Sequence, residues 1–394
     1  MIKILIYGKI QIKKGVGTMD IASIIGENIK RLKSERKISN RKLAEIIGVT
    51  HPTIGNYLEG KQIIDSEKLL TIANFFGVSF DYFFNKEHFE INLMFRADKP
   101  SEQMNDFDIN QLKIKIENYL KVVDLEGINF IPQIYNLNIK GSKLTKKDDK
   151  NIEKVANEIR RLFGIENMIP ENYYSVLENF GIHVISSPFK NSNFFGASSY
   201  SDKYGSFILV NSNDDVPEER QLFSLFHELG HLLFNRNEYK SPEFNPLYAH
   251  GQSDLNEKVA NKFAGYFLLP RDLVGDYIQT KKEEIDIFEM KQYFKVSIQA
   301  LYVALNNYSL ISKEKYKAFW KKINYNGWKK KEPAALDKKS IEYKNIRLID
   351  SIKKLYLEEE ISTNRISEVL DIDIYDTRKL VKKWNDLDDQ YEHF

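Results

Sequence analysis

The chain has 394 residues, which suits two or three domains at about 150 residues each. Its 42% of hydrophobic and 29% of charged residues are ordinary for a globular protein, and a net charge of +2 excludes neither nucleic acid nor protein as a partner. The absence of cysteine excludes disulfides and thiolate metal sites, and no apolar run reaches the roughly 18 residues of a membrane span, so we expect a cytoplasmic protein without a membrane partner.

Residues 1–18 precede a second methionine, Met19. The run Lys13-Lys14-Gly15-Val16 is what a purine-rich ribosome-binding sequence would encode if it were translated. Two interpretations are open. Either residues 1–18 are a mis-annotated start, or they form a short extension whose alternating isoleucines resemble a strand.

Residues 19–86 have apolar residues at spacings of three and four, which predicts a bundle of short helices. A tight turn at Gly48-Val49 separates the second helix from the third, and Thr50 stands at the next N-cap. The segment KLAEIIGVTHPTIGNYLEGK resembles the lambda-repressor/Cro-like (XRE) helix-turn-helix family. Four residues occupy this family's small, turn-glycine, apolar and buried positions: Ala44, Gly48, Val49 and Ile54.

The resemblance implies that residues 19–86 bind operator or promoter DNA, and proteins of this type commonly bind as homodimers. Between residues 26 and 61, eight basic residues stand against four acidic ones, which favours phosphate contacts. The alternative is a bundle that serves only for dimerisation. The residues expected on or beside the DNA surface are Asn40, Arg41, Thr50, His51, Pro52, Thr53, Asn56, Tyr57 and Lys61.

Residues 87–150 are expected to form a partly helical connector, with a helix at 107–123 and a solvated loop at 140–150. From residue 151 the pattern alternates between helices and strands. Helices are expected at 152–163, 171–180 and 217–235, and strands at 182–185, 194–200 and 207–211. The turn at 202–205 makes the last two strands a hairpin.

The helix at 217–235 carries the segment FHELGH. His227 and His231 lie one turn apart on one face, so both imidazoles can reach a single metal ion. Glu228 is adjacent to a ligand and can reach a metal-bound water without being a ligand itself. The bland alternative is a pair of histidines in an ordinary helix.

A second helix, predicted to end before Pro270, supplies a third ligand. Glu257 shares one face with Ala260 and Ala264, and such small residues allow close approach to the first helix at Gly230. Asp254 is the alternative ligand. Asn261, one turn after Glu257, is expected to orient a ligand from behind.

FHELGHLLF followed by NEKVANKFAGYFLLP looks like the ImmA/IrrE family of metallopeptidases. The resemblance implies Zn²⁺ bound by His227, His231 and Glu257, with Glu228 as the general base of an endopeptidase at residues 151–310. It also implies cleavage of a repressor in phage, mobile-element or stress control. We further expect a substrate strand to add to 207–211, while His250, Tyr248 and Tyr266 leave the oxyanion donor unassigned.

Residues 311–394 are expected to be helical. The segments 288–305 and 361–384 each resemble two helices joined by a turn, and either DNA contact or core packing explains them. His183, on an apolar strand, is expected in the core.

The predicted fold is therefore multidomain: an all-α helix-turn-helix bundle, an α+β zincin-like metallopeptidase core with a small sheet, and a helical C-terminal region. The predicted function is that of a DNA-binding transcriptional regulator with a zinc endopeptidase domain. One alternative is a non-catalytic repressor of antitoxin type whose metal domain is a sensor or dimerisation scaffold, although Glu228 argues against it. Another is a peptidase whose N-terminal bundle binds protein.

Overall fold

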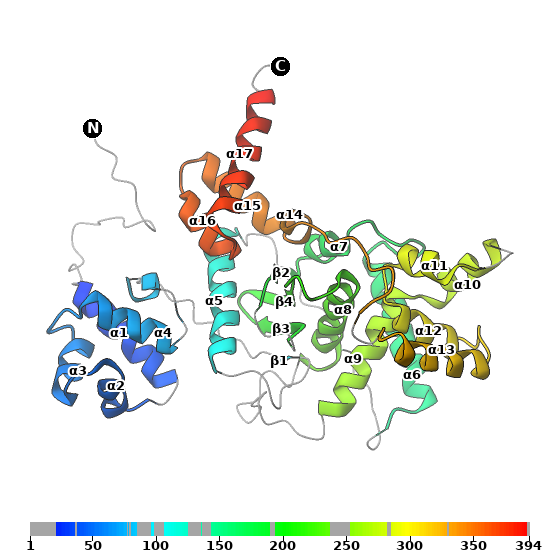
Figure 1. Cartoon of the computed structure of the whole chain (residues 1–394), viewed down its shortest axis with the longest axis horizontal. Helices are drawn as coiled ribbons and strands as arrows, with labels where there is room; N and C mark the ends of the chain where they lie inside the picture. The colour runs from blue at the N-terminus through cyan, green and yellow to red at the C-terminus, as the bar shows by residue number, and fades with distance from the viewer. Residues whose placement is uncertain are drawn as a thin grey trace. The chain divides into compact units, whose positions relative to one another are not determined.

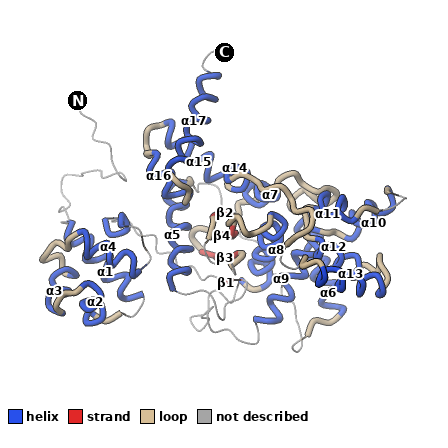
Figure 2. The backbone as a smooth tube through the Cα atoms, viewed as in Figure 1, coloured by secondary structure: helices blue, strands red, loops and turns tan. Residues whose placement is uncertain are grey.

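The computed structural model describes residues 21–35, 38–76, 78, 80–84, 96–97, 106–124, 135, 143–189, 194–236, 253–281, 285–328 and 331–391. The start at residues 1–18, Tyr248 and His250 lie outside these ranges. The chain divides into two compact units, one of residues 1–91 with 105–118 and one of residues 92–104 with 119–394. Most of the described chain is helical, and the strands lie together in one small sheet (Figure 2).

The first unit is the predicted bundle. Its elements are α1 (Ile21–Glu35), α2 (Asn40–Ile47), α3 (His51–Leu58), α4 (Ser66–Phe76) and the 3-10 helix η1 (Phe80–Phe84). Ser39 and Thr50 cap α2 and α3 as predicted, and Gly48 adopts the left-handed conformation that the turn requires. The buried apolar side chains of all these elements form one core, and the Asn28 side chain ties η1 to α1 by donating to two carbonyls of η1.

The sheet of the second unit has the order β1-β3-β4-β2 (Figure 1). Its strands are β1 (Arg96–Ala97), β2 (His183–Ser187), β3 (Gly196–Ser201) and β4 (Gly205–Asn211). β3 and β4 form the predicted antiparallel hairpin, and β2 runs parallel to β4. β1 pairs antiparallel with β3 and was not predicted, because two residues are too few to show a period.

The helices of the second unit surround this sheet and continue beyond it. In chain order they are α6 (Lys146–Leu162), α7 (Tyr173–Asn179), α8 (Glu218–Phe234), α9 (Ser253–Leu268), α10 (Arg271–Thr280), α11 (Ile287–Phe294), α12 (Ile298–Asn307), α13 (Lys313–Tyr325), α14 (Ile341–Lys344), α15 (Ile346–Leu357), α16 (Thr363–Leu370) and α17 (Ile374–Tyr391). The predicted connector helix is α5 (Asp106–Val122), within which the division between the two units falls.

The predicted loop at 140–150 was wrong from residue 146 onward, because α6 begins there. Thr145 accepts from the backbone N–H of Asp148, and the Asp148 carboxylate accepts from the N–H of Thr145. This reciprocal capping box satisfies two backbone donors and starts the helix within a run of charged residues. The charged residues of 146–150 therefore lie on the first turn of an amphipathic helix.

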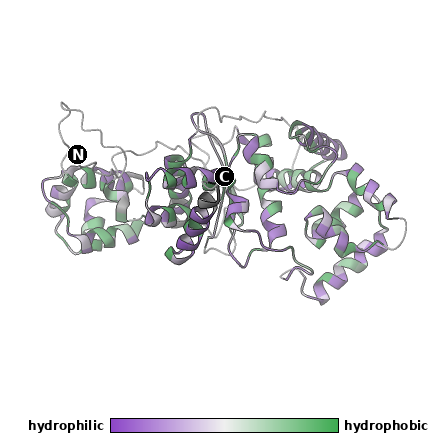
Figure 3. Cartoon of the chain, turned by 90° about the horizontal axis from the view of Figure 1, so that it is seen from above, coloured by the Kyte–Doolittle hydropathy of each residue, from purple (hydrophilic) through white to green (hydrophobic). Residues whose placement is uncertain are grey.

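α8 lies against β3, β4 and α9, so it is buried on nearly all sides. Phe226 of α8 stacks on Phe267 of α9, with ring centroids 4.2 Å apart. A Cβ atom on Gly230 would lie 3.0 Å from Ala260 Cα, so glycine allows the close approach that the sequence predicted. In contrast with α8, most helices are amphipathic and carry hydrophobic and hydrophilic residues on different faces (Figure 3). Within the described ranges, no helix is long and apolar enough to cross a bilayer.

Candidate metal centre

The first turn of α8 is fixed by two buried ion pairs. Glu218 meets Lys344 at 2.7 Å, and Glu219 meets Lys291 at 2.6 Å. Leu336 and Lys339 donate backbone N–H groups to the same carboxylates. Residues more than 70 positions after Glu219 in the sequence thus hold the N-terminal end of the helix in place.

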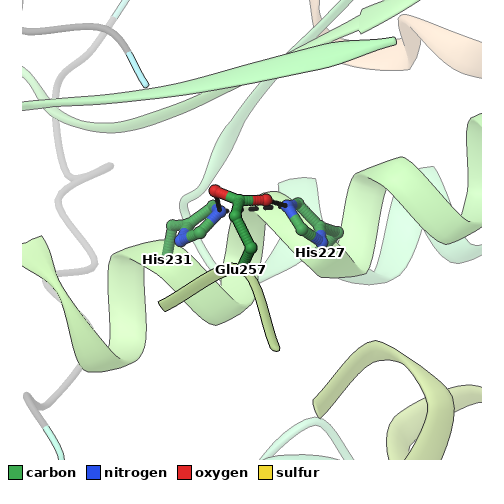
Figure 4. Close-up of side chains that lie close together, drawn as sticks. All are labelled: His227, His231 and Glu257. Atoms are coloured by element: carbon green, nitrogen blue, oxygen red, sulfur yellow. Dashed lines mark hydrogen bonds and ion pairs between the residues drawn. The ribbon is translucent and has the colours of Figure 1, made fainter. Parts of the chain in front are cut away.

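Three side chains predicted as metal ligands converge on one point (Figure 4). The Nε2 atoms of His227 and His231 are 2.9 Å apart. The carboxylate of Glu257 reaches across from α9, with one oxygen 3.2 Å from His227 Nε2 and the other 3.3 Å from His231 Nε2. Both histidines are buried, and the Glu257 side chain is 20% exposed. The side chain of the alternative ligand, Asp254, lies outside the described part of the chain.

The donors fit a tetrahedral zinc ion. Ligand atoms about 2.0–2.1 Å from zinc stand about 3.3 Å from one another, and three ligands leave a fourth position open. Asn261 Oδ1 lies 3.1 Å from His227 Nδ1, as predicted for an orienting residue. Asn235 Oδ1 lies 3.4 Å from His231 Nδ1. Because an amide oxygen only accepts, each Nδ1 carries the proton and each Nε2 presents its lone pair to the centre.

Charge favours a cation at this point. Burial by itself raises the pKa of Glu257, but the two adjacent imidazoles outweigh burial and hold the pKa well below its usual value. Glu257 is therefore ionised. Two imidazole lone pairs and one carboxylate in a largely buried place make a site with net negative character, which a divalent ion neutralises.

Glu228 lies beside the ligands, facing the sheet. Ser198 of β3 donates its hydroxyl to the Glu228 carboxylate at 2.6 Å. A Cβ atom on Gly196, two residues earlier on the same face, would lie 3.2 Å from Glu228 Cγ. The small residues of β3 thus allow the carboxylate to fit against the strand, and Ser198 fixes its orientation.

Sequence reasoning missed Asn235 and Ser198. Asn235 stands four residues after His231 and ends the same helix, so helical spacing could have found it. Ser198 has no such signal, because its position relative to Glu228 depends on how the hairpin packs on α8.

The predicted addition of a substrate strand to 207–211 was wrong. β4 is central, with β3 on one side and β2 on the other, so neither edge is free for a peptide. β3 is the strand next to Glu228, and β1 pairs with it at Ala197 and Ser198. A peptide that adds to β3 at these residues has to replace β1.

Tyr266 and His183, two further residues considered in the sequence, make contacts within the fold away from the metal ligands. Tyr266 donates its hydroxyl to Asp149 at 2.8 Å and packs against Tyr308, so it is held towards α6. His183 is fully buried, as expected, and its Nε2 lies 2.9 Å from the Tyr204 carbonyl oxygen. Burial is the main reason that the pKa of His183 is lowered to about 4, and the Arg347 guanidinium adds to this.

The residues predicted to contact DNA lie in the first unit, and most of them are exposed or partly exposed. His51, Pro52 and Asn56 are exposed on α3. The Thr50 and Thr53 hydroxyls are 2.7 Å apart, while Arg41 and Lys61 are exposed beside acidic partners. Asn40 is the first residue of α2 and is partly exposed. The prediction that Tyr57 contacts DNA was wrong. Its side chain is buried in the bundle core, so its role is packing rather than base contact.

Comparison with known proteins supports the assignment of both the N-terminal bundle and the domain that holds the metal ligands. Residues 26–88 match the family model of a helix-turn-helix domain. Residues 177–306 match the model of the IrrE N-terminal-like domain of the M78 peptidases. The chain combines an XRE-type helix-turn-helix domain with an ImmA/IrrE-like domain. Both resemblances seen in the sequence are thereby confirmed, as is the predicted fold class.

Two relatives from Bacillus subtilis are similar over a short stretch. The SPbeta prophage-derived HTH-type transcriptional regulator YonR is 29% identical over 70 residues, which are 18% of this chain and 65% of the relative. The HTH-type transcriptional regulator YqaE is 30% identical over 64 residues, which are 16% of this chain and 55% of the relative. The chain thus spans less than two thirds of the length of either relative. The helix-turn-helix domain is of a DNA-binding, transcription-regulating type.

Proposed function

We propose that this chain is a DNA-binding transcriptional regulator whose ImmA/IrrE-like domain is a zinc-dependent endopeptidase. Its substrate is a repressor or another regulatory protein in phage, mobile-element or stress control. The observation that carries the proposal is the position of Glu228, which lies next to two histidines and a glutamate that can hold one ion. A purely structural metal site has no use for a buried carboxylate that is not a ligand.

The residues divide the chemistry between them. His227, His231 and Glu257 would hold the ion, and bound zinc supplies Lewis acidity towards a peptide carbonyl. Glu228 accepts a proton from the attacking water and delivers it to the leaving amine. The Ser198 hydroxyl keeps the Glu228 carboxylate in one orientation, while Asn261 and Asn235 keep both Nδ1 atoms protonated.

The presence of a helix-turn-helix domain on the same chain supports a regulatory substrate. A peptidase carried to DNA meets repressors at high local concentration, because both bind the same molecule. One of the similar relatives is a prophage-derived HTH-type regulator. This fits a role in the control of mobile elements.

Zinc content of the purified chain tests the centre. The wild type should hold about one zinc ion per chain, since three protein ligands and one open position define a catalytic site. Glu257→Ala should hold much less. Glu314→Ala, which removes an exposed glutamate on α13, is the matched control and should bind zinc like the wild type. A folded wild type that takes up no zinc would instead indicate a regulator whose metal domain is a scaffold.

Cleavage is tested separately. New protein N-termini should be compared between cells that express the wild type and cells that express Glu228→Gln at the same level. We expect one N-terminus, from a regulatory protein, that appears only with the wild type. Zinc binding by Glu228→Gln should remain, since Glu228 is not among the three ligands. Identical N-termini in both strains would argue against peptidase activity.

A further inference from the structure

Among the helices that the structure describes, three pairs share one backbone pattern. They are α2–α3, α11–α12 and α16–α17. The first helix of each pair has eight residues, and the residue after it is left-handed. Two positions later a polar residue caps the second helix. The left-handed residues are Gly48, Lys295 and Asp371, and the caps are Thr50, Ser297 and Asp373. The pattern is that of a helix-turn-helix.

The pair α16–α17 repeats α2–α3 in detail. Ser362 accepts from the N–H of Arg365 at 3.2 Å, as Ser39 accepts from that of Lys42 at 3.1 Å. In the turn, the N–H of Ile372 donates to the Ser367 carbonyl at 3.2 Å. The N–H of Val49 donates to the Ala44 carbonyl at 3.0 Å in the same way. The buried residues coincide too: Ile366, Leu370, Thr377 and Val381 take the places of Leu43, Ile47, Ile54 and Leu58.

The pairs differ in what lies over the second helix. In α12 the first residue, Ile298, is 1% exposed, and Tyr302 stacks on Phe319 of α13 with ring centroids 3.6 Å apart. Its outer face is therefore part of a core. In α17 the first residue, Ile374, is 36% exposed and Tyr375 is 67% exposed. The start of α17 faces solvent, as the start of α3 does.

The exposed side of α17 is basic. Arg378, Lys379, Lys382 and Lys383 are all exposed, and their spacing places them along one side of the helix. Lys379 lies 4.0 Å from the Tyr375 ring centroid and 3.1 Å from Asp376, while Lys383 pairs with Glu342. Arg378 and Lys382 therefore carry most of the charge available to a ligand. An exposed tyrosine beside such cations suits a base edge flanked by phosphates.

We propose that α16–α17 is a second helix-turn-helix element that binds double-stranded DNA. Tyr375 contacts base edges, and Arg378 and Lys382 contact phosphates. The aspartates at the turn keep phosphates away from the first residues of α17, so contacts fall on its second and third turns. The same chain then holds DNA at two places, once through α3 and once through α17.

The test uses the full chain in an Arg41→Glu/Asn56→Asp background, which weakens the N-terminal element. Binding to a fluorescently labelled, random-sequence DNA duplex is measured over a range of salt concentrations. Arg378→Glu/Lys382→Glu should weaken binding roughly tenfold at low salt and reduce the salt dependence of log K by about two, since two phosphate contacts are lost. Lys313→Glu/Lys317→Glu, on exposed positions of α13, changes the same number of charges and should have little effect.

A second variant distinguishes the contact of Tyr375 with base edges from the contacts of the basic residues with phosphates. Tyr375→Ala should weaken binding several-fold and leave the salt dependence unchanged, because the ring contacts no phosphate. Thermal unfolding of each variant should match that of the parent, since all the changed residues are exposed. Equal losses in the α17 and α13 charge variants would mean a nonspecific charge effect and overturn the proposal. Unchanged DNA binding in all three would overturn it as well and point to a protein partner for this surface.

Discussion

The pairs α11–α12 and α16–α17 have the same turn and different surroundings. α13 and Trp328 cover α12, and Lys291 of α11 is fully buried against Glu219 of α8. α17 instead presents its first turns and its basic residues to solvent. The comparison teaches that this backbone pattern is a general way to pack two helices at an angle. The residues on the outer face, and what covers them, decide whether it can bind anything.

The largest expected contrast is between two ion pairs. Lys291 and Glu219 are buried, whereas Lys379 and Asp376 on α17 are more than half exposed. Glu219→Ala should lower the free energy of unfolding by about 3–5 kcal/mol, because it leaves a buried charge without its main partner. Asp376→Ala should change it by less than about 1 kcal/mol. Urea unfolding measures the free energy of unfolding of both variants. Similar losses of stability would contradict the difference in burial between the two ion pairs.

A second contrast concerns the first residue of each second helix. Ile298→Ala should cost about 2–4 kcal/mol, because it opens a cavity in a packed cluster. Ile374→Ala, at the equivalent exposed place, should cost no more than about 0.5 kcal/mol. The same unfolding curves serve as the measurement. A large loss at Ile374 would show that the start of α17 is packed against something.

Glu178 of α7 accepts from the backbone N–H of Arg347 on α15, so a titratable carboxyl joins the C-terminal helices to the rest of the unit. Burial raises the pKa of Glu178 to about 7; the backbone N–H and charge of Arg347 partly oppose this, and the charge of Asp350 adds to it. The folded state therefore keeps a proton between pH 4.5 and 7 that the unfolded state releases, and the wild type loses stability as pH rises through this window. Glu178→Gln removes this loss. The free energy of unfolding of Glu178→Gln minus that of the wild type should therefore increase by on the order of 2 kcal/mol between pH 4.5 and 7. Urea unfolding at each pH measures this difference.

The smallest effects concern two glycines of the α2–α3 pair, Gly48 and Gly55. Gly48 is left-handed, so Gly48→Ala should cost about 1 kcal/mol. Gly55 lies inside α3 with open space around it, at the place that Arg378 takes in α17. Gly55→Ala should therefore stabilise the first unit by about 0.5–1 kcal/mol. Thermal unfolding should show opposite signs, and the same sign at both would contradict either the left-handed conformation of Gly48 or the open space around Gly55.

Much of the candidate site could be predicted because it is local. His227, Glu228 and His231 belong to one helix, whose period fixes their directions before any packing occurs. Glu257, Asn261 and Ala260 could be placed on one face of a second helix for the same reason. The close approach at Gly230 followed from the small residues on both helices. The metal and catalytic roles of these residues stay predictions until zinc and cleavage are measured.

The rest depended on contacts between distant segments. β1 is two residues long and exists only because β3 presents an edge to it. Ser198 meets Glu228 because the hairpin packs on α8 in one register, and a shift by one residue would turn it to the other face. The failure of the predicted substrate strand at 207–211 has the same origin, since strand order is not written in the pattern of any single strand.

The sequence by itself determined the helices, their caps and turns, and the set of side chains that could hold a metal ion. The helices, caps and turns depend on residues at most one or two helical turns apart, and so do the ligands within α8 and within α9 taken separately. Only the tertiary structure decided that α12 is covered while α3 and α17 keep exposed faces, which strand lies beside Glu228, and which lysines neutralise the start of α8. These outcomes depend on what each surface meets, and burial is a property of the assembled chain rather than of its local pattern.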